Sequence, residues 1–330
     1  MQQEPTQYEL YDPPADGITA VQFSPTDSQL LLVSSWDKTV RLYDVAANQQ
    51  RAKFEHRAAV LDCCFSDASR GYSGGLDKGV NMLDLTTSTD TPLGMHDEPV
   101  RCLSWSQESN QLLTGSWDRT IRLWDTRAAE PLLGKYNQPA KIFSMDVTHN
   151  KLVVAMAGRH VFIYDIRNMT ETLQRRESSL KFMTRCVRSM PNGEGYASSS
   201  IEGRIAVEFF DPSPETQSRK YAFKCHRQVI DGVDTVYPVN ALAFNPVHGT
   251  FASGGADGVV NVWDRWNKKR LRQYPRYPTS VASLAFSHDG RLLAVASSYT
   301  FEEGEKDHAP DSVFVRMIGE NECRPKQVGG

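Results

Sequence analysis

The sequence predicts an all-β protein built from seven similar units arranged radially, and three observations support this prediction. One short strand pattern recurs seven times, with starts at Ile18, Val60, Val100, Ile142, Thr184, Val239 and Val281. Five of the six steps between these starts are 40 or 42 residues long, and the remaining step is 55 residues. Each start is followed by further short runs rich in Val, Ile, Leu and aromatic residues, as expected for four strands in every unit.

The strands of each unit are expected in a fixed order. The starting pattern, such as ITAVQF (18–23), is followed by a second run, such as QLLLVSS (29–35). A short turn containing an aspartate comes next, as in WDKT (36–39), and a third run then ends in an aromatic residue or leucine before an aspartate, as in RLYD (41–44). A fourth, weaker run leads to the next unit. The long step predicts one insertion, near the polar, turn-rich stretch QVIDGVDTVY (228–237).

The seventh unit lacks a clear fourth strand after SVFVRM (312–317), whereas the segment YELYDPP (8–14) precedes the first unit. We therefore expect Tyr8–Tyr11 to pair with the last unit. Joining the two ends of the chain in this way removes an open sheet edge, which would otherwise promote aggregation.

Composition argues against several classes of protein. A net charge of −3 and a pI near 6.3 over 330 residues disfavour a general nucleic-acid binder. The six cysteines show no CxxC pair and no metal-binding spacing, so they are expected to be reduced and mostly buried, as in a cytosolic or nuclear protein. The N-terminal residues lack the apolar run of a signal peptide, and no stretch approaches the roughly 18 apolar residues of a membrane span.

The repeat resembles the WD-repeat propeller, whose units run from a Gly-His pair to a Trp-Asp pair. The resemblance covers nearly the whole chain and implies one seven-bladed β-propeller over residues 1–330, closed by the N-terminal strand. Only two of the third runs end in the Trp-Asp pair, at Trp124-Asp125 and Trp263-Asp264. The residues that replace this tryptophan in other units are Tyr43, Leu83, Tyr164 and Phe210.

The aspartates of the short turns are interpreted as structural rather than catalytic. They recur unit after unit, whereas a catalytic acid would appear once and would need a partner that tunes its pKa. We expect them to anchor the His, Ser or Thr, and Trp side chains of the same unit. These aspartates are Asp37, Asp77, Asp118 and Asp257, and the matching histidines are His56, His96 and His226. No enzyme activity is expected.

Two tryptophans break the pattern of the turns. The residue before the turn aspartate is Trp36 and Trp117 in two units, but Leu76 and Ala256 in others, so the fold does not need an indole there. Tryptophan is enriched in the energetically dominant parts of interfaces. We favour a binding role, because the two residues occupy equivalent sites two units apart on one face; the alternative is that each ring packs over a neighbouring unit.

Cationic residues are concentrated in units four to six. Arg101 and Arg185 occupy the second position of the starting strand, which lies near the same face as the turns. Each further cation could simply be solvated, but together they favour an anion-binding face, since Arg and Lys bind phosphate through charge-assisted hydrogen bonds. The further cations are Arg175, Arg176, Lys181, Arg204, Arg219, Lys220, Lys224 and Arg227.

Several stretches resemble one family of mitotic checkpoint WD-repeat proteins, known as "budding uninhibited by benzimidazoles, member three". The likeness is strongest over residues 174–264, and its elements include RRESSLKFMTRC, SSIEGRIAVEFFDPSPE, YAFKCHR and YPVNALAFNP. The messenger-RNA export propeller that docks on a nucleoporin is a sister family and shares the SIEGR and FKCHR elements. The stretch FMTRC and the QVIDGVDT loop depart from the checkpoint pattern, and such departures can alter the choice of partner.

The resemblance implies a spindle assembly checkpoint scaffold in the nucleus, located at kinetochores in mitosis. Trp36, Trp117 and Arg185 would bind the GLEBS peptides of the checkpoint kinase and its pseudokinase relative. Arg204 and Lys224 would bind the phosphothreonine of Met-Glu-Leu-Thr motifs on a phosphorylated kinetochore scaffold. It further implies a monomeric propeller in hetero-complexes, with no cofactor, no metal, no direct nucleic-acid contact and no membrane contact. The alternative is a messenger-RNA export propeller that binds a nucleoporin GLEBS motif.

Overall fold

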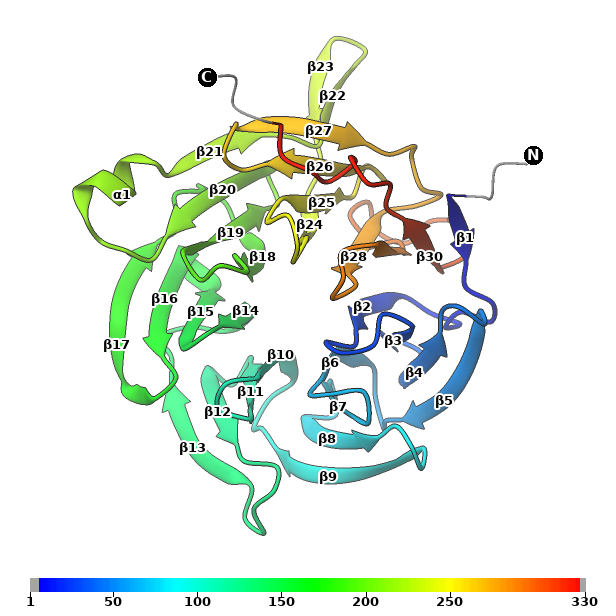
Figure 1. Cartoon of the computed structure of the whole chain (residues 1–330), viewed down its shortest axis with the longest axis vertical. Helices are drawn as coiled ribbons and strands as arrows, with labels where there is room; N and C mark the ends of the chain where they lie inside the picture. Colours follow the sequence, from blue (N-terminus) through cyan, green and yellow to red (C-terminus); the bar gives the residue numbers. More distant parts are fainter. Residues whose placement is uncertain (1–5, 327–330) are drawn as a thin grey trace.

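Seven four-stranded antiparallel sheets surround a central channel, like the blades of a propeller (Figure 1). The computed structural model describes residues 6–326. Each blade places its first strand beside the channel and its fourth strand at the rim, and the chain passes from blade to blade around the ring. The predicted seven-bladed, all-β fold is confirmed over this range; residues 1–5 and 327–330, which the sequence also assigns to the propeller, lie outside it.

The strands of blades 1 to 3 are β2 (Ile18–Phe23), β3 (Leu30–Ser35), β4 (Thr39–Asp44), β5 (Gln49–Glu55), β6 (Val60–Phe65), β7 (Arg70–Gly75), β8 (Gly79–Asp84), β9 (Thr89–Met95), β10 (Val100–Ser106), β11 (Gln111–Ser116), β12 (Thr120–Trp124) and β13 (Leu132–Asn137). Those of blades 4 and 5 are β14 (Ile142–Thr148), β15 (Lys151–Met156), β16 (His160–Asp165), β17 (Asn168–Glu177), β18 (Thr184–Ser189), β19 (Gly195–Ser200), β20 (Arg204–Phe209) and β21 (Tyr221–Lys224). Blades 6 and 7 contain β24 (Val239–Phe244), β25 (Phe251–Gly255), β26 (Val260–Asp264), β27 (Lys269–Gln273), β28 (Val281–Phe286), β29 (Leu292–Ser297) and β30 (Ser312–Met317).

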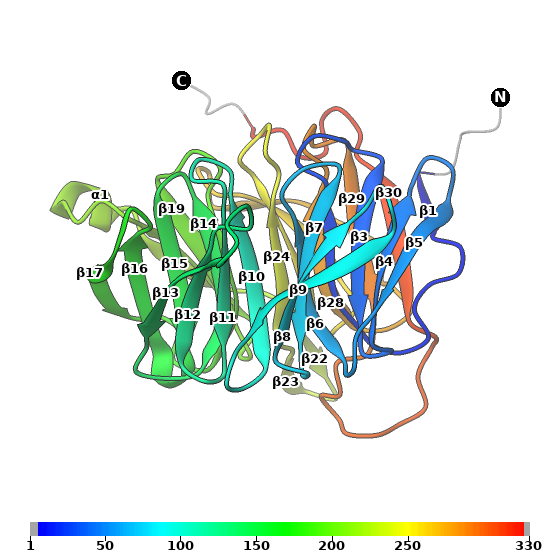
Figure 2. The same cartoon turned by 90° about the horizontal axis from the view of Figure 1, so that it is seen from below.

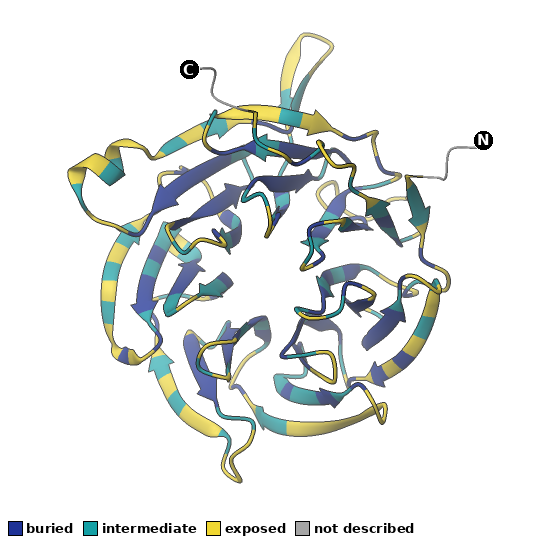
Figure 3. Ribbon diagram, viewed as in Figure 1, coloured by how far each residue is buried: buried dark blue, intermediate teal, exposed yellow. Residues whose placement is uncertain are grey.

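Burial changes from the inner to the outer strands of a blade (Figure 3). All six residues of β3 are buried, because neighbouring blades cover both faces of this strand. The outermost strand β5 instead alternates between exposed and more buried residues, since one of its faces meets solvent. This difference explains why the fourth run of each unit is the weakest apolar signal in the sequence.

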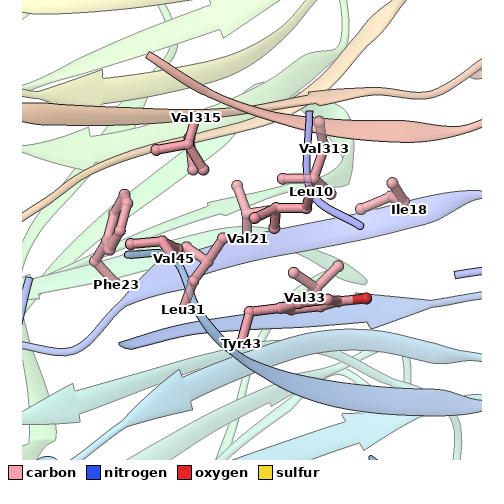
Figure 4. Close-up of a cluster of buried hydrophobic side chains, with 12 residues drawn as sticks. Leu10, Ile18, Val21, Phe23, Leu31, Val33, Tyr43, Val45, Val313 and Val315 are labelled. Atoms are coloured by element: carbon pink, nitrogen blue, oxygen red, sulfur yellow. The ribbon is translucent and has the colours of Figure 1, made fainter. Parts of the chain in front are cut away.

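The N-terminal strand closes the ring. β1 (Gln7–Glu9) pairs antiparallel with β30, placing Tyr8 opposite Val315, and the Leu10 nitrogen donates to the Val313 oxygen at 2.8 Å. Leu10 is buried in a cluster between blades 7 and 1 that includes Val313 and Tyr43 (Figure 4). The predicted pairing is therefore confirmed for Tyr8 to Leu10, whereas Tyr11 is 75% exposed and lies beyond the paired region.

Side chains in the channel connect neighbouring blades. The Asp62 carboxylate of blade 2 accepts a hydrogen bond from the Leu103 nitrogen of blade 3 at 2.8 Å. Asp146 of blade 4 likewise accepts from the Ser189 nitrogen of blade 5 at 2.6 Å. Two serine hydroxyl groups accept hydrogen bonds in the same way, Ser144 from the Val187 nitrogen and Ser283 from the Val21 nitrogen, each at 3.1 Å. These bonds satisfy N–H groups on the free edge of the innermost strands, which would otherwise lack a protein partner.

The long step between the fifth and sixth units contains two insertions rather than the single one predicted. The stretch expected as a polar turn forms a protruding hairpin, β22 (Arg227–Ile230) and β23 (Val233–Val236). A short helix, α1 (Pro214–Ser218), lies between β20 and β21 and is capped by the Ser213 side chain, which accepts from the Thr216 nitrogen. Another short helix, η1 (Ala157–Arg159), forms the turn between β15 and β16.

All six cysteines are buried and free, as expected from their spacing. Burial raises the pKa of the Cys102 thiol to about 12, so this group remains protonated at neutral pH. Within residues 6–326, no helix could span a bilayer, and no group of three His, Cys, Asp or Glu side chains is placed to hold a metal ion.

We expect removal of residues 1–12 to lower the melting temperature, because β30 would become an open edge and the cluster around Leu10 would lose a side chain. The free energy of unfolding should fall by about 2–5 kcal/mol or more, since truncating one buried leucine alone costs that amount. Differential scanning calorimetry of this deletion, compared with removal of residues 1–5 alone, measures the effect. A melting temperature equal to that of the full chain would show that β1 does not hold the ring together.

Candidate functional site

One face of the ring carries the turns between the second and third strands together with the loops that lead into each first strand. We call it the aspartate-turn face, because Asp37, Asp77, Asp118 and Asp257 lie in these turns. It is the lower side of the ring in Figure 2, where the β22–β23 hairpin and the loop between β29 and β30 project from it.

The turn aspartates of three blades anchor histidines, as predicted. In blade 3, Asp118 contacts His96 Nδ1 at 2.9 Å, and His96 Nε2 lies 2.7 Å from Thr114 Oγ1. Trp124 Nε1 donates to the same hydroxyl at 2.9 Å. Burial raises the pKa of Asp118, but hydrogen bonds from His96 and Thr120 outweigh it, so the pKa lies below its usual value. All of these polar groups are engaged within the blade, which fits a structural role.

The same arrangement recurs in two other blades. It comprises His226, Asp257, Ser253 and Trp263 in blade 6, and His56, Asp77 and Ser73 in blade 2, where no tryptophan takes part.

Blade 1 departs from this prediction. Asp37 accepts hydrogen bonds from Arg41 at 2.9 Å and from the Ala15 nitrogen at 3.1 Å, not from a histidine. The reason is that the segment entering blade 1, PPAD (13–16), contains no histidine, and the Arg41 guanidinium takes the vacant position beside the carboxylate.

A hollow of about 610 Å³ lies over the mouth of the channel on the aspartate-turn face, and we call it the central hollow. Trp36, Trp117, Arg101 and Arg185 all line it, although they come from blades 1, 3 and 5. Trp36 rests over Gly17, where an added Cβ would come within 3.2 Å of the ring, and 49% of the residue stays exposed. The structure therefore brings the two predicted tryptophans and Arg185 together at one place.

A β-bulge directs the arginines toward this hollow. In all seven blades the pairing between the first and second strands skips the second residue of the first strand, the position of Arg101 and Arg185. A bulged residue is released from the regular alternation of side chains and can point in a new direction. The seven bulged residues, Thr19, Leu61, Arg101, Phe143, Arg185, Asn240 and Ala282, together surround the channel.

The two arginines of the hollow form no direct ion pair within the described residues 6–326. Arg185 Nε and Nη2 donate to the Asn240 side-chain oxygen at 3.1 and 2.9 Å. Within residues 6–326, no carboxylate oxygen lies within 4.0 Å of the Arg101 or Arg185 guanidinium nitrogens. Burial lowers the pKa of Arg185, and the neighbouring Arg101 lowers it further, because both effects disfavour its positive charge. An anionic ligand would relieve this repulsion.

Arg204 and Lys224 form a second cationic site on blade 5. They are directly opposite each other in the pairing of β20 with β21, so their side chains share one face of the sheet. Arg204 Nε lies 3.6 Å from a Glu202 oxygen, and Lys224 is exposed. Neither lines the central hollow, which is shaped by the inner part of the ring.

The sequence of this chain matches a known repeat family and known checkpoint proteins. The WD domain, G-beta repeat family matches residues 6–44, 88–125 and 221–264. The chain is 56% identical to mitotic checkpoint protein BUB3.1 of Arabidopsis thaliana over 96% of this chain and 94% of that protein. It is 49% identical to mitotic checkpoint protein bub3 of Dictyostelium discoideum, over 96% and 97% of the two chains. The chain belongs to the Bub3 family of mitotic checkpoint proteins.

Matches at lower sequence identity include proteins with other names. The messenger-RNA export factor GLE2 of Chaetomium thermophilum is 35% identical to this Bub3-family chain, over 96% of this chain and 92% of that protein. A solved structure of U3-55K superimposes with a TM-score of 0.79 at 15% identity, covering 94% and 98% of the two chains. At that identity the likeness shows the propeller fold alone.

The other cations of the Bub3-family chain do not form the single anion-binding face that the sequence predicts. Arg219 lies over the Phe209 ring at 4.7 Å, and Lys220 follows it before β21 begins, at the end of this strand opposite Lys224. Arg176 is bonded to Gln174, and Arg227 pairs with Asp234 at 2.8 Å. Residues close in sequence separate because a strand carries the chain from one face of the ring to the other.

Two residues of the hollow were missed from the sequence. Asn240 accepts hydrogen bonds from the Arg185 guanidinium. Phe301 lines the hollow and is 62% exposed. Phe301 lies in the blade 7 counterpart of the turns that carry Trp36 and Trp117. The only sequence signal was an aromatic residue within the polar stretch FEEGEKDHAPD (301–311), and the length of that stretch concealed the correspondence.

The free energy of unfolding should fall as the pH is lowered, in part through His96. Burial lowers the pKa of His96, and the hydrogen bond with Asp118 only partly offsets this. The stability contributed by the neutral imidazole is complete above the ordinary histidine pKa of about 6.5 and declines below it, because the unfolded chain takes up a proton more readily. We expect His96→Gln to flatten the dependence between about pH 7.5 and 5.5 in urea unfolding. The exposed His308→Gln is the control, and a slope for His96→Gln as steep as in the wild type would contradict the prediction.

Proposed function

We propose that this chain is a spindle assembly checkpoint scaffold. Its aspartate-turn face would bind the GLEBS peptides of the checkpoint kinase and of its pseudokinase relative, and would recruit both to phosphorylated Met-Glu-Leu-Thr motifs at kinetochores. The observation that carries this proposal is the central hollow, where Trp36 and Trp117 lie with two arginines that lack carboxylate partners in the described chain. Membership of the Bub3 family supports the same assignment.

The chemistry of the hollow suits an acidic peptide. Aromatic side chains supply large apolar contacts at little entropic cost, and Arg and Trp are the residues that most often dominate binding energy. Arg185 is held by Asn240, so its guanidinium is already oriented before a ligand arrives. A hollow of about 610 Å³ accommodates a few side chains rather than a whole peptide. The remainder of a longer peptide would therefore extend over the aspartate-turn face of neighbouring blades.

The paired cations on blade 5 suit a phosphorylated threonine. A phosphate group carries up to two negative charges near neutral pH and accepts several strong hydrogen bonds. Arg204 and Lys224 present two donors from adjacent strands. Because they lie outside the central hollow, a kinase peptide and a phosphorylated motif could occupy the face at the same time. Such simultaneous binding is what a scaffold requires.

The messenger-RNA export propeller remains the second candidate, since GLE2 of Chaetomium thermophilum matches over nearly the whole chain. Its identity of 35% is lower than the 56% and 49% of the two checkpoint proteins, so the checkpoint role is favoured. A pull-down that retrieves a nucleoporin and RNA, but no checkpoint kinase, would reverse this preference. Recovery of checkpoint kinases from mitotic cells, with the chain located in the nucleus and at kinetochores, is the outcome we expect.

We expect Arg185→Glu to abolish binding of a synthetic GLEBS peptide from the checkpoint kinase. Reversing a half-buried charge that becomes covered when it meets a ligand carboxylate costs about 2–5 kcal/mol or more, which corresponds to a loss of affinity of at least about 30-fold. Isothermal titration calorimetry measures the change. Arg127→Glu is the matched control, because Arg127 is exposed, pairs with Asp125 and lies outside the hollow. Equal affinity of Arg185→Glu and wild type would refute the assignment of the hollow.

Replacement of both Arg204 and Lys224 by alanine should weaken binding of a phosphothreonine Met-Glu-Leu-Thr peptide by at least about tenfold, while GLEBS binding is retained. Each charge-assisted hydrogen bond contributes about 1.5–3 kcal/mol. Fluorescence anisotropy with phosphorylated and unphosphorylated peptides separates the phosphate contribution from the rest. Lys220→Ala, at the opposite end of β21, should bind like the wild type. If the double variant still prefers the phosphorylated peptide to the same extent, the phosphate is bound elsewhere.

A further inference from the structure

The loop between β29 and β30 forms one wall of the central hollow. It spans residues 298–311, where blades 1 to 3 have only a short turn, and it projects from the aspartate-turn face (Figure 2). The loop folds around Tyr299, whose hydroxyl donates to the Gly304 oxygen at 2.9 Å and accepts from the Glu303 nitrogen at 3.0 Å. These contacts fix the position of Phe301, which lines the hollow, and of Glu302, which follows it and lines a neighbouring cavity.

Phe301 is exposed and has a positive φ angle. Its φ angle is 61°, in the left-handed region that residues other than glycine rarely adopt, and 62% of the residue is exposed. The ring contacts only the neighbouring Tyr299 among the described aromatic residues, with centroids 5.3 Å apart. Lys38, Lys78 and Arg119 also have positive φ angles in the corresponding turns, so this backbone conformation belongs to the turn and does not by itself indicate binding. An exposed aromatic side chain buries little area and therefore stabilises the free chain little. Phe301 therefore provides the hollow with a third aromatic side chain, beside Trp36 and Trp117.

Glu302 reaches the residue that holds Arg185. The Asn240 side-chain nitrogen donates to Glu302 Oε1 at 3.4 Å and to Thr300 Oγ1 at 3.2 Å, while the Asn240 oxygen accepts both bonds from Arg185. The other Glu302 oxygen accepts from Ser280 at 3.4 Å, and Thr300 also bonds to the carboxylate. Glu302 thus places a negative charge near Arg185 without forming a direct ion pair. This charge raises the pKa of Arg185, against the effect of burial.

We propose that Glu302 is an internal competitor of the acidic residues of the bound peptide, and that Phe301 is a peptide-binding residue. In the free chain the Glu302 carboxylate stands beside the Asn240–Arg185 pair. A peptide carboxylate that reaches Arg185 displaces it, and the peptide packs against Phe301 as well as against the two tryptophans. This inference rests on the proposed function of the same hollow and names how binding there is regulated.

The alternative role for Glu302 is to position Asn240, and the two roles differ in the sign of their effect. A positioning residue improves binding, so its loss would weaken the complex. A competing carboxylate opposes an acidic ligand, both by repulsion and by the contacts that must be broken, so its loss strengthens the complex. The contacts of Glu302 outside its own loop, at 3.4 Å to both Asn240 and Ser280, are long and favour the competitor, since weak bonds are readily exchanged; its bond with Thr300 lies within the loop.

Calorimetric titration of the full chain with a synthetic GLEBS peptide of the checkpoint kinase tests this inference. We expect Glu302→Gln to bind about two- to fivefold more tightly, the range for an exposed charge interaction. Phe301→Ala should bind at least about fivefold more weakly, as for a residue that contributes substantially to an interface. Glu305→Gln, an exposed carboxylate of the same loop outside the hollow, should leave the affinity unchanged.

A second peptide, with its acidic residues replaced by glutamine, identifies the cause. The gain from Glu302→Gln should disappear with this neutral peptide, whereas the loss from Phe301→Ala should persist. If the wild type binds the acidic peptide and Arg185→Glu abolishes binding, but Glu302→Gln weakens binding or leaves it unchanged, the competitor role is overturned and the proposed function stands. If the wild type does not bind the acidic peptide at all, both fall together.

Discussion

The aspartate-turn face depends on how the innermost strands meet around the channel. Each of these strands has one edge that no strand of its own blade can pair, and side chains of the preceding blade satisfy part of it, as Asp62 does for the Leu103 nitrogen. The same strands carry the bulge that turns their second residue toward the channel mouth. Contacts between blades and the direction of Arg101 and Arg185 therefore arise from one feature of the backbone. A rigid ring with oriented cations follows from it.

The ring separates two kinds of polar chemistry. The His–Asp–hydroxyl arrangements lie within single blades, where every polar atom is bonded, and they stabilise the turns. The arginines of the central hollow lie between blades and lack carboxylate partners among residues 6–326. The polar groups of these arrangements already have partners within the chain, whereas the guanidinium groups of Arg101 and Arg185 have no carboxylate partner in the described residues and can bind an anionic ligand. This distinction explains why the abundant His and Asp residues give no indication of catalysis.

Repetition made much of this arrangement predictable. The recurring first strand located seven blades, and the missing last strand correctly pointed to Tyr8 as part of the closure. The turn tryptophans could be assigned to one face because equivalent positions of a repeat share the same place in the blade. Residues at equivalent positions of a repeat lie at equivalent places in their blades, and Trp36 and Trp117 both line the hollow for that reason.

The sequence was least informative where a copy departs from the repeat. Asp37 binds Arg41 at 2.9 Å where the segment entering blade 1 offers no histidine, whereas the equivalent Arg122 lies 3.8 Å from Asp118, which contacts His96 instead. The cations around β21 appeared as one cluster because linear proximity does not record which end of a strand a residue occupies. Phe301 was concealed because its turn is several residues longer than its counterparts. Long-range pairing and insertions thus determine the parts of the site that periodicity cannot supply.

The buried thiols have a consequence of their own. They are distributed unevenly: blade 2 contains Cys63 and Cys64, blade 3 contains Cys102 and blade 5 contains Cys186, while Cys225 follows β21 and Cys323 follows β30. A thiol-alkylating reagent modifies only thiolate that solvent can reach, so each of these groups is protected while its blade stays closed. The chain therefore carries natural chemical reporters, and mass spectrometry of alkylated fragments could distinguish which blade opens first when the ring begins to come apart.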